Sequence, residues 1–392
     1  MRSRRPLPST RRTPANDSEA LAIRVLSMAG GDRPVDAVLR EELNPSKGVP
    51  RDVARNVARW VFRHHRWRGL LDTSKSWMEQ LAEARELARR FDTQSNSFTK
   101  EDWARVVPEW VWDHVEVTIP WLMSLQREPL VWIRTRPGTA GELIGEMGDL
   151  DAPCEIAPDA LVYEGPEDLF RSPQFHEGRF EVQDLTSQLV TLVADPKPGE
   201  SWWDGCAGEG GKTVHLADLM QNKGVVWATD RAEWRLKTLR ARAGRAGLFN
   251  IRWGVWQGGD DRPKGVSFDG VLIDAPCSGV GTWQRNPHAR WTTTPRDVEE
   301  LAARQLSLLR AGAAGLKSGG RLVYAVCTLT RMETTEVAKA FTAAQPDFEP
   351  LPVPPIFHWG AGAGGPPNQV HFWPQDWQGN GMFVATWRKR KS

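Results

Sequence analysis

The chain has 392 residues, a formal net charge of +2 at pH 7 and four cysteines. Its length allows two or three domains with their own cores, and its near-neutral charge means that any attraction for nucleic acid must come from local basic patches. The cysteines lie far apart, without a Cys-x-x-Cys pair or a histidine cluster nearby, which argues against a zinc site and against a secreted disulfide framework. No apolar stretch is long enough for a membrane span, so we expect a cytoplasmic protein.

The N-terminal part predicts a basic tail followed by helices. Residues 1–17 are rich in Arg, Ser and Pro and have no amphipathic period, which favours a disordered basic tail over a transit peptide. Apolar residues at helical spacing predict an all-helical domain over 18–125. Part of this domain is strongly basic, with Arg51, Arg55, Arg59, Arg63, Arg66 and Arg68. Such a row occupies one face of a helix, which is either solvated or binds RNA phosphates.

Beyond residue 125, strands and helices alternate. Short strands around a helix predict a small α+β insert over 126–190. Over 191–392, apolar strands alternate with helices and are expected at 201–203, 225–229, 251–255, 268–273, 321–326 and 382–387. Strands joined by crossover helices predict an α/β domain with a mostly parallel sheet and helices on both faces. Ligands of such sheets bind beyond the carboxyl ends of the strands.

A glycine-rich loop from Asp204 to Thr213 follows the first of these strands and opens a helix. Its glycines let a ligand approach the backbone, and the helix N-terminus favours anionic groups. The loop ends in Gly-Lys-Thr like a nucleotide-binding phosphate loop, but that motif needs a glycine five positions before Gly211, where Cys206 stands. The spacing of the Rossmann dinucleotide motif also fails, so the loop by itself leaves the ligand open.

Acidic residues and cysteines stand at the ends of the other strands. Asp230 is placed to accept hydrogen bonds from the ribose of a nucleoside cofactor, or else to cap the following helix. Cys277 and Cys327 each follow an apolar strand. A single free cysteine is usually a small buried hydrophobe, but two at strand ends, with Asp274 three residues before Cys277, favour a thiolate site.

The run Asp274-Ala-Pro-Cys-Ser-Gly-Val-Gly281, followed by Arg285-Asn-Pro287 and Trp291, is the most specific feature of the chain. It is accompanied by Gln183-Asp184, by the loop at Asp204, by Tyr324-Ala-Val-Cys-Thr328 and by Asn380-Gly-Met-Phe-Val-Ala385. Together these motifs resemble the Sun/Fmu family of RNA (cytosine-5) methyltransferases, and the basic N-terminal helices resemble the NusB-like domain of its ribosomal-RNA members. The resemblance implies a Rossmann-like catalytic domain at 191–392 and an RNA-binding, NusB-like domain at 18–125.

The resemblance also implies roles for individual residues. Cys327 is expected to add as a thiolate to C6 of cytosine, so that C5 can attack the methyl group of S-adenosylmethionine. Its ordinary pKa of about 8.5 means that it needs local help to ionise. Asp274 is expected to hydrogen-bond or protonate N3 of the ring, with its carboxylate oriented by Lys212. Cys277 is expected to assist loss of the C5 proton and release of the product.

S-adenosylmethionine is the implied cofactor, resting on the glycine-rich loop with its ribose on Asp230. The residues expected to bind it are Cys206, Ala207, Gly208, Glu209, Gly210, Gly211, Lys212, Asp230, Arg235, Asp260 and Asp274. The family's adenine-side aspartate has no clean match, because Gly259 stands in its place, and the neighbouring Asp260 is taken as the contact to adenine. Glu209 and Val326 depart from the family's motifs, which have proline and threonine there. The Glu209 carboxylate is expected near the methionine end of the cofactor, where it either pairs with the amino group or weakens binding.

The leading prediction is therefore an S-adenosylmethionine-dependent enzyme that methylates C5 of a cytosine in RNA. Ribosomal RNA is favoured as the substrate, with transfer RNA as the alternative. The cytosine has to be unstacked, because both faces of its ring must be reached. A non-catalytic RNA-binding or ribosome-assembly factor of the same fold is the second hypothesis, and a phosphate-loop nucleotidase is the third. We expect a monomer that needs no metal ion.

Overall fold

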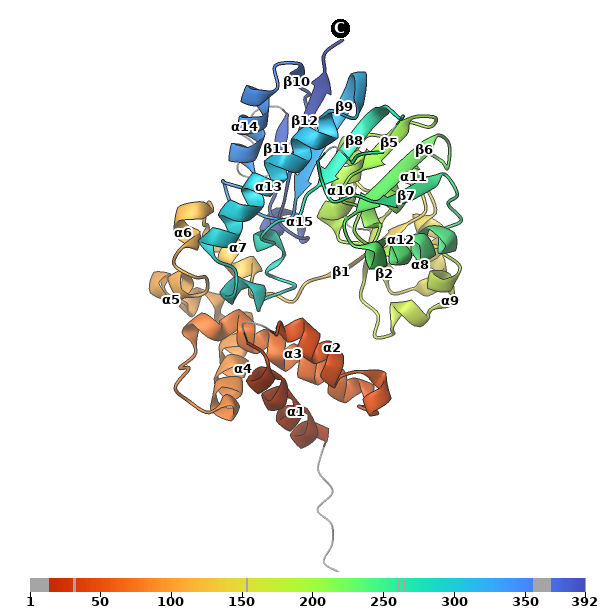
Figure 1. Cartoon of the computed structure of the whole chain (residues 1–392). Coiled ribbons are helices and arrows are strands. Elements are labelled where there is room, and N and C mark those ends of the chain that lie inside the picture. The colour runs from red at the N-terminus through yellow and green to blue at the C-terminus, as the bar shows by residue number, and fades with distance from the viewer. Residues whose placement is uncertain are drawn as a thin grey trace, which may run out of the picture. The chain divides into compact units, whose positions relative to one another are not determined.

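The computed structural model describes residues 14–30, 33–152, 154–259, 261–263, 265–354 and 368–391, and Figure 1 shows its helices and strands. The chain forms two compact units. The first consists of residues 1–109 together with 286–292, and the second of residues 110–285 and 293–392. The helical domain predicted at 18–125 extends past this division. Residues 1–13 of the predicted tail lie outside the described ranges, and the first helix begins at Pro14.

The first unit is built from helices. They are α1 (Pro14–Met28), α2 (Val35–Glu42), α3 (Arg51–Trp67), α4 (Trp77–Gln94) and α5 (Lys100–Arg105), with the short 3-10 turns η1 (Pro45–Lys47), η2 (Arg68–Leu70), η3 (Ser95–Ser97) and η6 (Ala289–Trp291). On α3, Val53, Val57 and Val61 recur at every fourth residue and are buried against α1 and α2. The exposed side of the same helix carries Arg51, Arg55 and Arg59.

The segment 286–292 belongs to the core of the first unit. Arg290 is fully buried, and its guanidinium donates a hydrogen bond to the backbone carbonyl of Arg66 at 3.2 Å. Trp291 donates from Nε1 to the carbonyl of His65 at 2.7 Å. The last carbonyls of a helix have no partner within the helix. Here a segment from a distant part of the sequence satisfies them, which stabilises the end of α3.

The second unit begins with α6 (Val111–His114) and α7 (Ile119–Ser124), and a small antiparallel sheet follows. Its strands are β1 (Val131–Thr135), β2 (Leu150–Asp151), β3 (Ala160–Tyr163) and β4 (Phe180–Val182), in the order β2-β3-β1-β4. Between them lie α8 (Ala140–Met147), η4 (Leu169–Arg171) and α9 (Pro173–His176). This segment confirms that a small α+β insert precedes the large sheet.

The large sheet has the strand order β10-β12-β9-β8-β5-β6-β7, and β11 also pairs with β12. Its strands are β5 (Ser201–Asp204), β6 (Val225–Asp230), β7 (Ile251–Val255), β8 (Phe268–Asp274), β9 (Leu316–Val326), β10 (Phe348–Pro350), β11 (Gln369–Phe372) and β12 (Met382–Lys389). Strands β5 to β9 are parallel, whereas β12 runs antiparallel to β9, β10 and β11. The sheet is therefore mostly parallel, as predicted.

Helices cover both faces of this sheet (Figure 1). The helices of the second unit that follow the small sheet are α10 (Leu185–Ala194), α11 (Gly211–Leu219), α12 (Glu233–Arg245), α13 (Pro295–Ala313), α14 (Thr335–Ala344), α15 (Pro374–Trp377) and the turn η5 (Val280–Thr282). Adjacent strand residues point to opposite faces. Trp202 accordingly packs in one core cluster with residues of α10, α11 and α12, and Trp203 packs in another with residues of α13 and α14.

The carboxyl ends of β5, β6, β8 and β9 meet at one edge of the sheet because these strands are parallel neighbours. The loops that leave this edge carry most of the residues singled out by their sequence motifs. In the parts of the chain that the structure describes, no helix has both the length and the apolar character needed to cross a membrane.

Candidate active site

The glycine-rich loop between β5 and α11 is pinned over the ends of the neighbouring strands. Backbone amides of Gly205 and Ala207 donate to carbonyls of β8 and β6, each at 2.9 Å. Gly210 has a positive φ of 89°, and a Cβ atom there would lie 2.5 Å from Cγ of Leu239 on α12. Only glycine therefore allows the loop to pass this close to α12 in that conformation.

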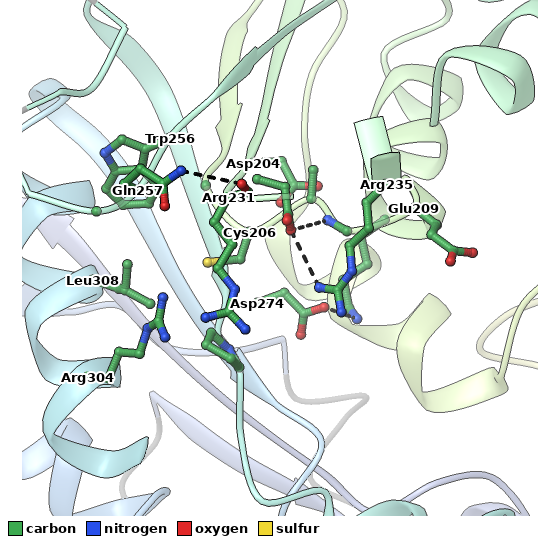
Figure 2. Close-up of a pocket in the computed structure, with 18 of the residues that line it drawn as sticks. Asp204, Cys206, Glu209, Arg231, Arg235, Trp256, Gln257, Asp274, Arg304 and Leu308 are labelled. Carbon is green, nitrogen blue, oxygen red and sulfur yellow. Dashed lines mark hydrogen bonds and ion pairs between the residues drawn. The ribbon is translucent and has the colours of Figure 1, made fainter. Parts of the chain in front are cut away.

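This loop forms one wall of a cavity of about 410 Å³. Figure 2 shows side chains from the carboxyl ends of β5, β6 and β8 around this cavity. Of the residues predicted to bind a cofactor, the cavity is lined by Cys206, Ala207, Gly208, Glu209, Gly211, Lys212, Asp230, Arg235 and Asp274. Gly210 faces Leu239 and is not among the lining residues, and Asp260 lies outside the described residues. The volume falls in the usual range of small-molecule sites.

Other lining residues were not predicted from the sequence. They are Ser187, Asp204, Gly205, Arg231, Trp256, Gln257, Gly258, Pro276, Arg304 and Leu308. Asp204 and the 256–258 segment directly follow strands, so their position at a strand end was an available signal. Arg304 and Leu308 come from the middle of α13, and nothing in their local sequence indicates that this helix reaches the cavity.

Asp204 is a buried carboxylate at the floor of the cavity. Burial raises its pKa to about 7, although the hydrogen bond from Thr213 Oγ1 to Oδ2, at 2.7 Å, acts in the opposite direction. Its Oδ1 atom is buried and has no hydrogen-bond partner among the described residues. A buried acceptor without a donor is costly unless a ligand supplies one. Asp204 is therefore suited to a ligand that carries a cationic N–H group.

Asp230 holds two backbone segments at the edge of the cavity. Its Oδ1 accepts from the backbone N–H of Ala232 at 2.8 Å, close to the start of α12. Its Oδ2 accepts from the backbone N–H of Gly208 at 3.0 Å and lies 3.8 Å from the Arg235 guanidinium. The carboxylate thus fixes the glycine-rich loop while lining the cavity, where it can accept hydrogen bonds from a hydroxylated ligand.

Lys212 and Asp274 form an ion pair at the same edge. The Lys212 ammonium donates to Asp274 Oδ2 at 2.7 Å. Burial lowers the pKa of Lys212, but the charge of Asp274 and this hydrogen bond outweigh burial and raise the pKa above its ordinary value. Lys212 therefore stays charged, and its hydrogen bond holds the Asp274 carboxylate in one orientation.

Cys277 and Cys327 lie against each other, with their sulfur atoms 3.3 Å apart. The hydrogen bond from Cys277 lowers the pKa of Cys327, and nearby Lys212 acts in the same direction. The same contact, together with burial, raises the pKa of Cys277 well above its usual range. Cys277 is consequently the thiol donor and Cys327 the group that ionises. Burial raises the pKa of the third nearby thiol, Cys206, far above its usual range, which makes it a poor nucleophile.

A single buried carboxylate, that of Glu333, ties the two cysteine loops together. Glu333 is completely buried. It accepts hydrogen bonds from the Ser278 amide at 2.8 Å, Ser278 Oγ at 2.5 Å, Thr328 Oγ1 at 3.0 Å, Thr330 Oγ1 at 2.8 Å and Gln305 Nε2 at 3.0 Å. Ser278 follows Cys277 and Thr328 follows Cys327, so these bonds fix the separation of the two thiols. Their number offsets the cost of burying a charge.

The turn after Cys277 is held by a glycine–glycine contact. The amide of Gly281 donates to the carbonyl of Cys327 at 3.1 Å, and the amide of Gly381 donates to the carbonyl of Gly281 at 2.7 Å. A Cβ atom on Gly281 would lie 1.9 Å from the carbonyl oxygen of Gly381. A larger residue at either position would push the Cys277 loop away from Cys327, so both glycines set the geometry of the site.

Arg285 joins three of the sequence motifs. Its guanidinium donates to Asp184 Oδ2 and to the Leu130 carbonyl, both at 2.9 Å, and to Asn380 Oδ1 at 3.2 Å. The Asn380 amide in turn donates to Asp184 Oδ1 at 3.0 Å. These motif residues therefore position the loops around the site.

The part of the chain described by the structure contains no cluster of three or more His, Cys, Asp or Glu side chains that could hold a metal ion.

Comparisons with known proteins identify similar sequences. The sequence model of the family described as 16S rRNA methyltransferase RsmB/F matches residues 191–388. The chain is 37% identical over 226 residues to the "Probable ribosomal RNA small subunit methyltransferase B" of Synechocystis, which is 55% of this chain and 49% of that protein. It is 33% identical over 278 residues to the ribosomal RNA small subunit methyltransferase B of Salmonella newport, which is 67% of this chain and 64% of that protein. The chain thus spans about half to just under two thirds of these relatives.

Solved structures of similar fold agree with this architecture. The crystal structure of PH0851 covers 96% of this chain and 99% of that chain, with a TM-score of 0.77 and 24% identity. A methyltransferase homolog protein from Pyrococcus horikoshii covers 69% of this chain and 90% of that chain, with a TM-score of 0.59 and 28% identity. The first similarity supports the fold of nearly the whole chain, and the second supports that of a large part of it.

Proposed function

Because the chain belongs to the RsmB/F family of 16S rRNA methyltransferases, we propose that it methylates C5 of a cytosine in RNA, with ribosomal RNA favoured over transfer RNA. The observation that carries this proposal is the contact between Cys277 and Cys327, whose sulfur atoms lie 3.3 Å apart within electrostatic reach of the Lys212–Asp274 pair. One ionising thiol and one protonated thiol side by side suit covalent catalysis on a ring. The proposal includes a cytoplasmic location, a monomeric state and a reaction without a metal ion.

The cavity fits S-adenosylmethionine, which when bound supplies an electrophilic methyl group. The Asp230 carboxylate would accept hydrogen bonds from the ribose hydroxyls, and the backbone of the 206–211 loop would support the methionine part. The unpartnered Oδ1 atom of Asp204 would accept a hydrogen bond from the amino group. In Figure 2 the side chain of Glu209 points away from Asp204 and Cys206, which places it apart from that contact.

The two cysteines and Asp274 would act on the cytosine in turn. The Cys327 thiolate would form a bond to C6, while the C5–C6 π pair moves to the C4–C5 bond and the C4–N3 π pair moves to N3, which takes a proton relayed by Asp274 from the Lys212 ammonium. C5 is thereby made nucleophilic and acquires the methyl group. Removal of the C5 proton by solvent, assisted by Cys277, then restores the C5–C6 double bond and expels the Cys327 thiolate from C6, and the N3 proton returns through Asp274 to Lys212. Cys277, in contact with Cys327, would stabilise the departing thiolate.

We propose that the predicted domain at 18–125 binds the RNA and that 191–392 is the catalytic domain. The exposed surface of α3 supports the first part. Arg51, Arg55 and Arg59 lie on its exposed side, opposite the buried valines of the same helix. Cationic side chains in a row suit the regularly spaced phosphates of a nucleic acid. This helix therefore offers a positive surface to an RNA substrate.

Methyl transfer to RNA tests the proposed function directly. Wild-type protein incubated with methyl-labelled S-adenosylmethionine and unmodified small-subunit ribosomal RNA is expected to place label in 5-methylcytosine, and less label in transfer RNA. Nuclease digestion followed by chromatography of the nucleosides identifies the product. RNA binding without label in either substrate would contradict the proposal and favour a ribosome-assembly factor of the same fold.

The ionisation of Asp204 predicts a pH-dependent affinity for the cofactor. With a pKa of about 7, Asp204 is mostly neutral at pH 6 and mostly ionised at pH 8, and only the carboxylate attracts the cationic amino group. We expect the Kd of S-adenosylmethionine, measured by calorimetry, to be about tenfold higher at pH 6 than at pH 8. Asp204→Asn should bind weakly with little pH dependence. A wild-type Kd that is constant over this range would contradict the role of Asp204.

The same pKa has a consequence for stability with the opposite dependence on pH. The folded protein holds the Asp204 proton more tightly than the unfolded chain does, because burial raises the pKa from 3.8 to about 7. The contribution of this group to the free energy of unfolding therefore falls as pH rises through that window. A cofactor that pairs with the carboxylate would recover part of this loss, so cofactor binding and Asp204 ionisation favour each other.

A further inference from the structure

Strand β7 forms an edge of the large sheet and lies beside α12 (Figure 1). The two elements expose an unusual set of side chains. We call this set the β7-edge patch, and it consists of Trp234, Lys237, Arg240, Trp253 and Val255. Trp234 is 58% exposed, Trp253 44% and Val255 51%. Tryptophan is usually largely buried in folded proteins, so two half-exposed indole rings on adjacent elements need an explanation.

The members of the β7-edge patch lie on one side of the molecule. Trp253 and Val255 are two residues apart on β7 and therefore point to the same face. That face is the one covered by α12, because the Arg240 guanidinium lies over the Trp253 ring at 5.2 Å. On α12, Trp234, Lys237 and Arg240 follow one another at three-residue spacing and form a row along the helix. The two indoles are thus separated by cationic side chains.

The patch is also strongly positive. Residues 231–252 contain Arg231, Arg235, Lys237, Arg240, Arg242, Arg245 and Arg252, but only one acidic residue, Glu233. Several of these cations have carboxylate partners, since Lys237 pairs with Glu233, and Arg242 and Arg245 pair with Glu181. Arg240 and Arg252 form no ion pair with any described residue. In a chain with a net charge of only +2, this is a local concentration of charge that is available to an anionic partner.

From this arrangement we propose that the β7-edge patch binds a single-stranded segment of the RNA substrate, a proposal that rests on the function proposed above. Exposed indole rings stack on unpaired bases, and arginines between them neutralise the phosphates. A protein partner would require a patch centre depleted of charge, whereas here cations lie between the aromatic rings. Arg231 and Arg235, which flank Trp234 in the sequence, line the cofactor cavity, so the bound strand would pass beside its opening.

Direct binding of a short RNA to the full chain tests this proposal without relying on methyl transfer. The probe is a fluorescein-labelled single-stranded RNA of about 12 nucleotides, followed by fluorescence anisotropy. The double variant Trp234→Ala/Trp253→Ala is expected to raise its Kd at least about tenfold, whereas Trp234→Phe/Trp253→Phe keeps most of the affinity because phenyl rings still stack. Arg240→Ala is expected to lower the slope of log Kd against log salt by about 1.

Matched controls separate this surface from a general loss of fold or charge. Trp112→Ala removes an indole ring of similar exposure, 43%, on α6, and Arg296→Ala removes an exposed cation of α13. Both should bind the probe like wild type, and all variants should unfold at the wild-type temperature. An unchanged Kd in both patch variants would overturn the proposal and leave the patch to a protein partner. If the patch variants bind normally and the wild-type protein transfers methyl groups, the proposed function still stands. If the patch variants lose RNA binding and the wild-type protein transfers no methyl group, only the proposal for the patch stands.

Discussion

Replacement of Cys327 by alanine is expected to abolish methyl transfer while leaving cofactor binding unchanged. Cys327 is the thiol whose pKa is lowered, by the hydrogen bond from Cys277 and by Lys212, so it is the group that can attack C6 at neutral pH. Alanine has no nucleophile at that position. Loss of the nucleophile from a covalent enzyme typically reduces kcat by several orders of magnitude, and we expect a decrease of at least about 1,000-fold.

The cofactor cavity provides the control for this variant. Cys327 is not among the residues that line it, so the Kd of S-adenosylmethionine for Cys327→Ala should match the wild-type value. Cys154→Ala is the matched substitution of a partly buried free cysteine outside the cofactor cavity, and it should retain methyl transfer. Substantial activity of Cys327→Ala would exclude Cys327 as the nucleophile, and an inactive Cys206→Ala with normal cofactor affinity would reassign that role to Cys206.

Replacement of Cys277 by alanine is expected to trap RNA on the protein. The raised pKa of Cys277 comes first from its hydrogen bond with Cys327. Once Cys327 has bonded to C6, that partner is no longer a thiolate, and Cys277 becomes free to assist the steps that follow. Without Cys277, the C5 proton is lost slowly and the bond between C6 and the Cys327 sulfur breaks slowly. Turnover should fall at least about 100-fold, as for loss of an acid–base group. The covalent adduct should therefore accumulate.

Denaturing gel electrophoresis with labelled RNA measures this adduct. Cys277→Ala should give a slowly migrating band that wild type lacks at steady state, and Cys277→Ala/Cys327→Ala should give none. Loss of the Cys277 donor also raises the pKa of Cys327, so the band should form more slowly at neutral pH and faster as pH rises through the alkaline range. An active Cys277→Ala variant without any adduct would contradict the role assigned to this thiol.

Much of the fold followed from the sequence because the relevant signals are local. The apolar strands that end at Asp204, Asp230 and Asp274 were predicted from their composition, and the alternation with helices predicted the mostly parallel sheet. The placement of 286–292 in the core of the first unit was not predicted. It depends on Arg290 meeting backbone carbonyls more than two hundred residues away in the sequence, such as that of Arg66, and no local pattern records such a contact.

Some features of the candidate site could likewise be predicted from the sequence, and others could not. The glycine-rich loop and both cysteines could be found because their motifs are contiguous in the sequence. The pKa of Asp204 and the convergence of donors on Glu333 depend on which side chains surround a buried carboxylate, so they became visible only in the structure. Glu209 shows the limit most clearly, since its position in the loop was correct but the direction of its side chain is a property of the folded loop (Figure 2).

The position of β12 determines when the protein becomes competent during its own synthesis. β12 occupies the place beside β9, where Phe383 pairs with Val326 next to Cys327, and Gly381 holds the turn after Cys277. These residues emerge from the ribosome after every other part of the site. A nascent chain therefore possesses the cofactor loop before it possesses an ordered pair of thiols. The loops that carry the two cysteines are therefore held together by Gly381 and β12 only after β12 has been translated and has paired with β9.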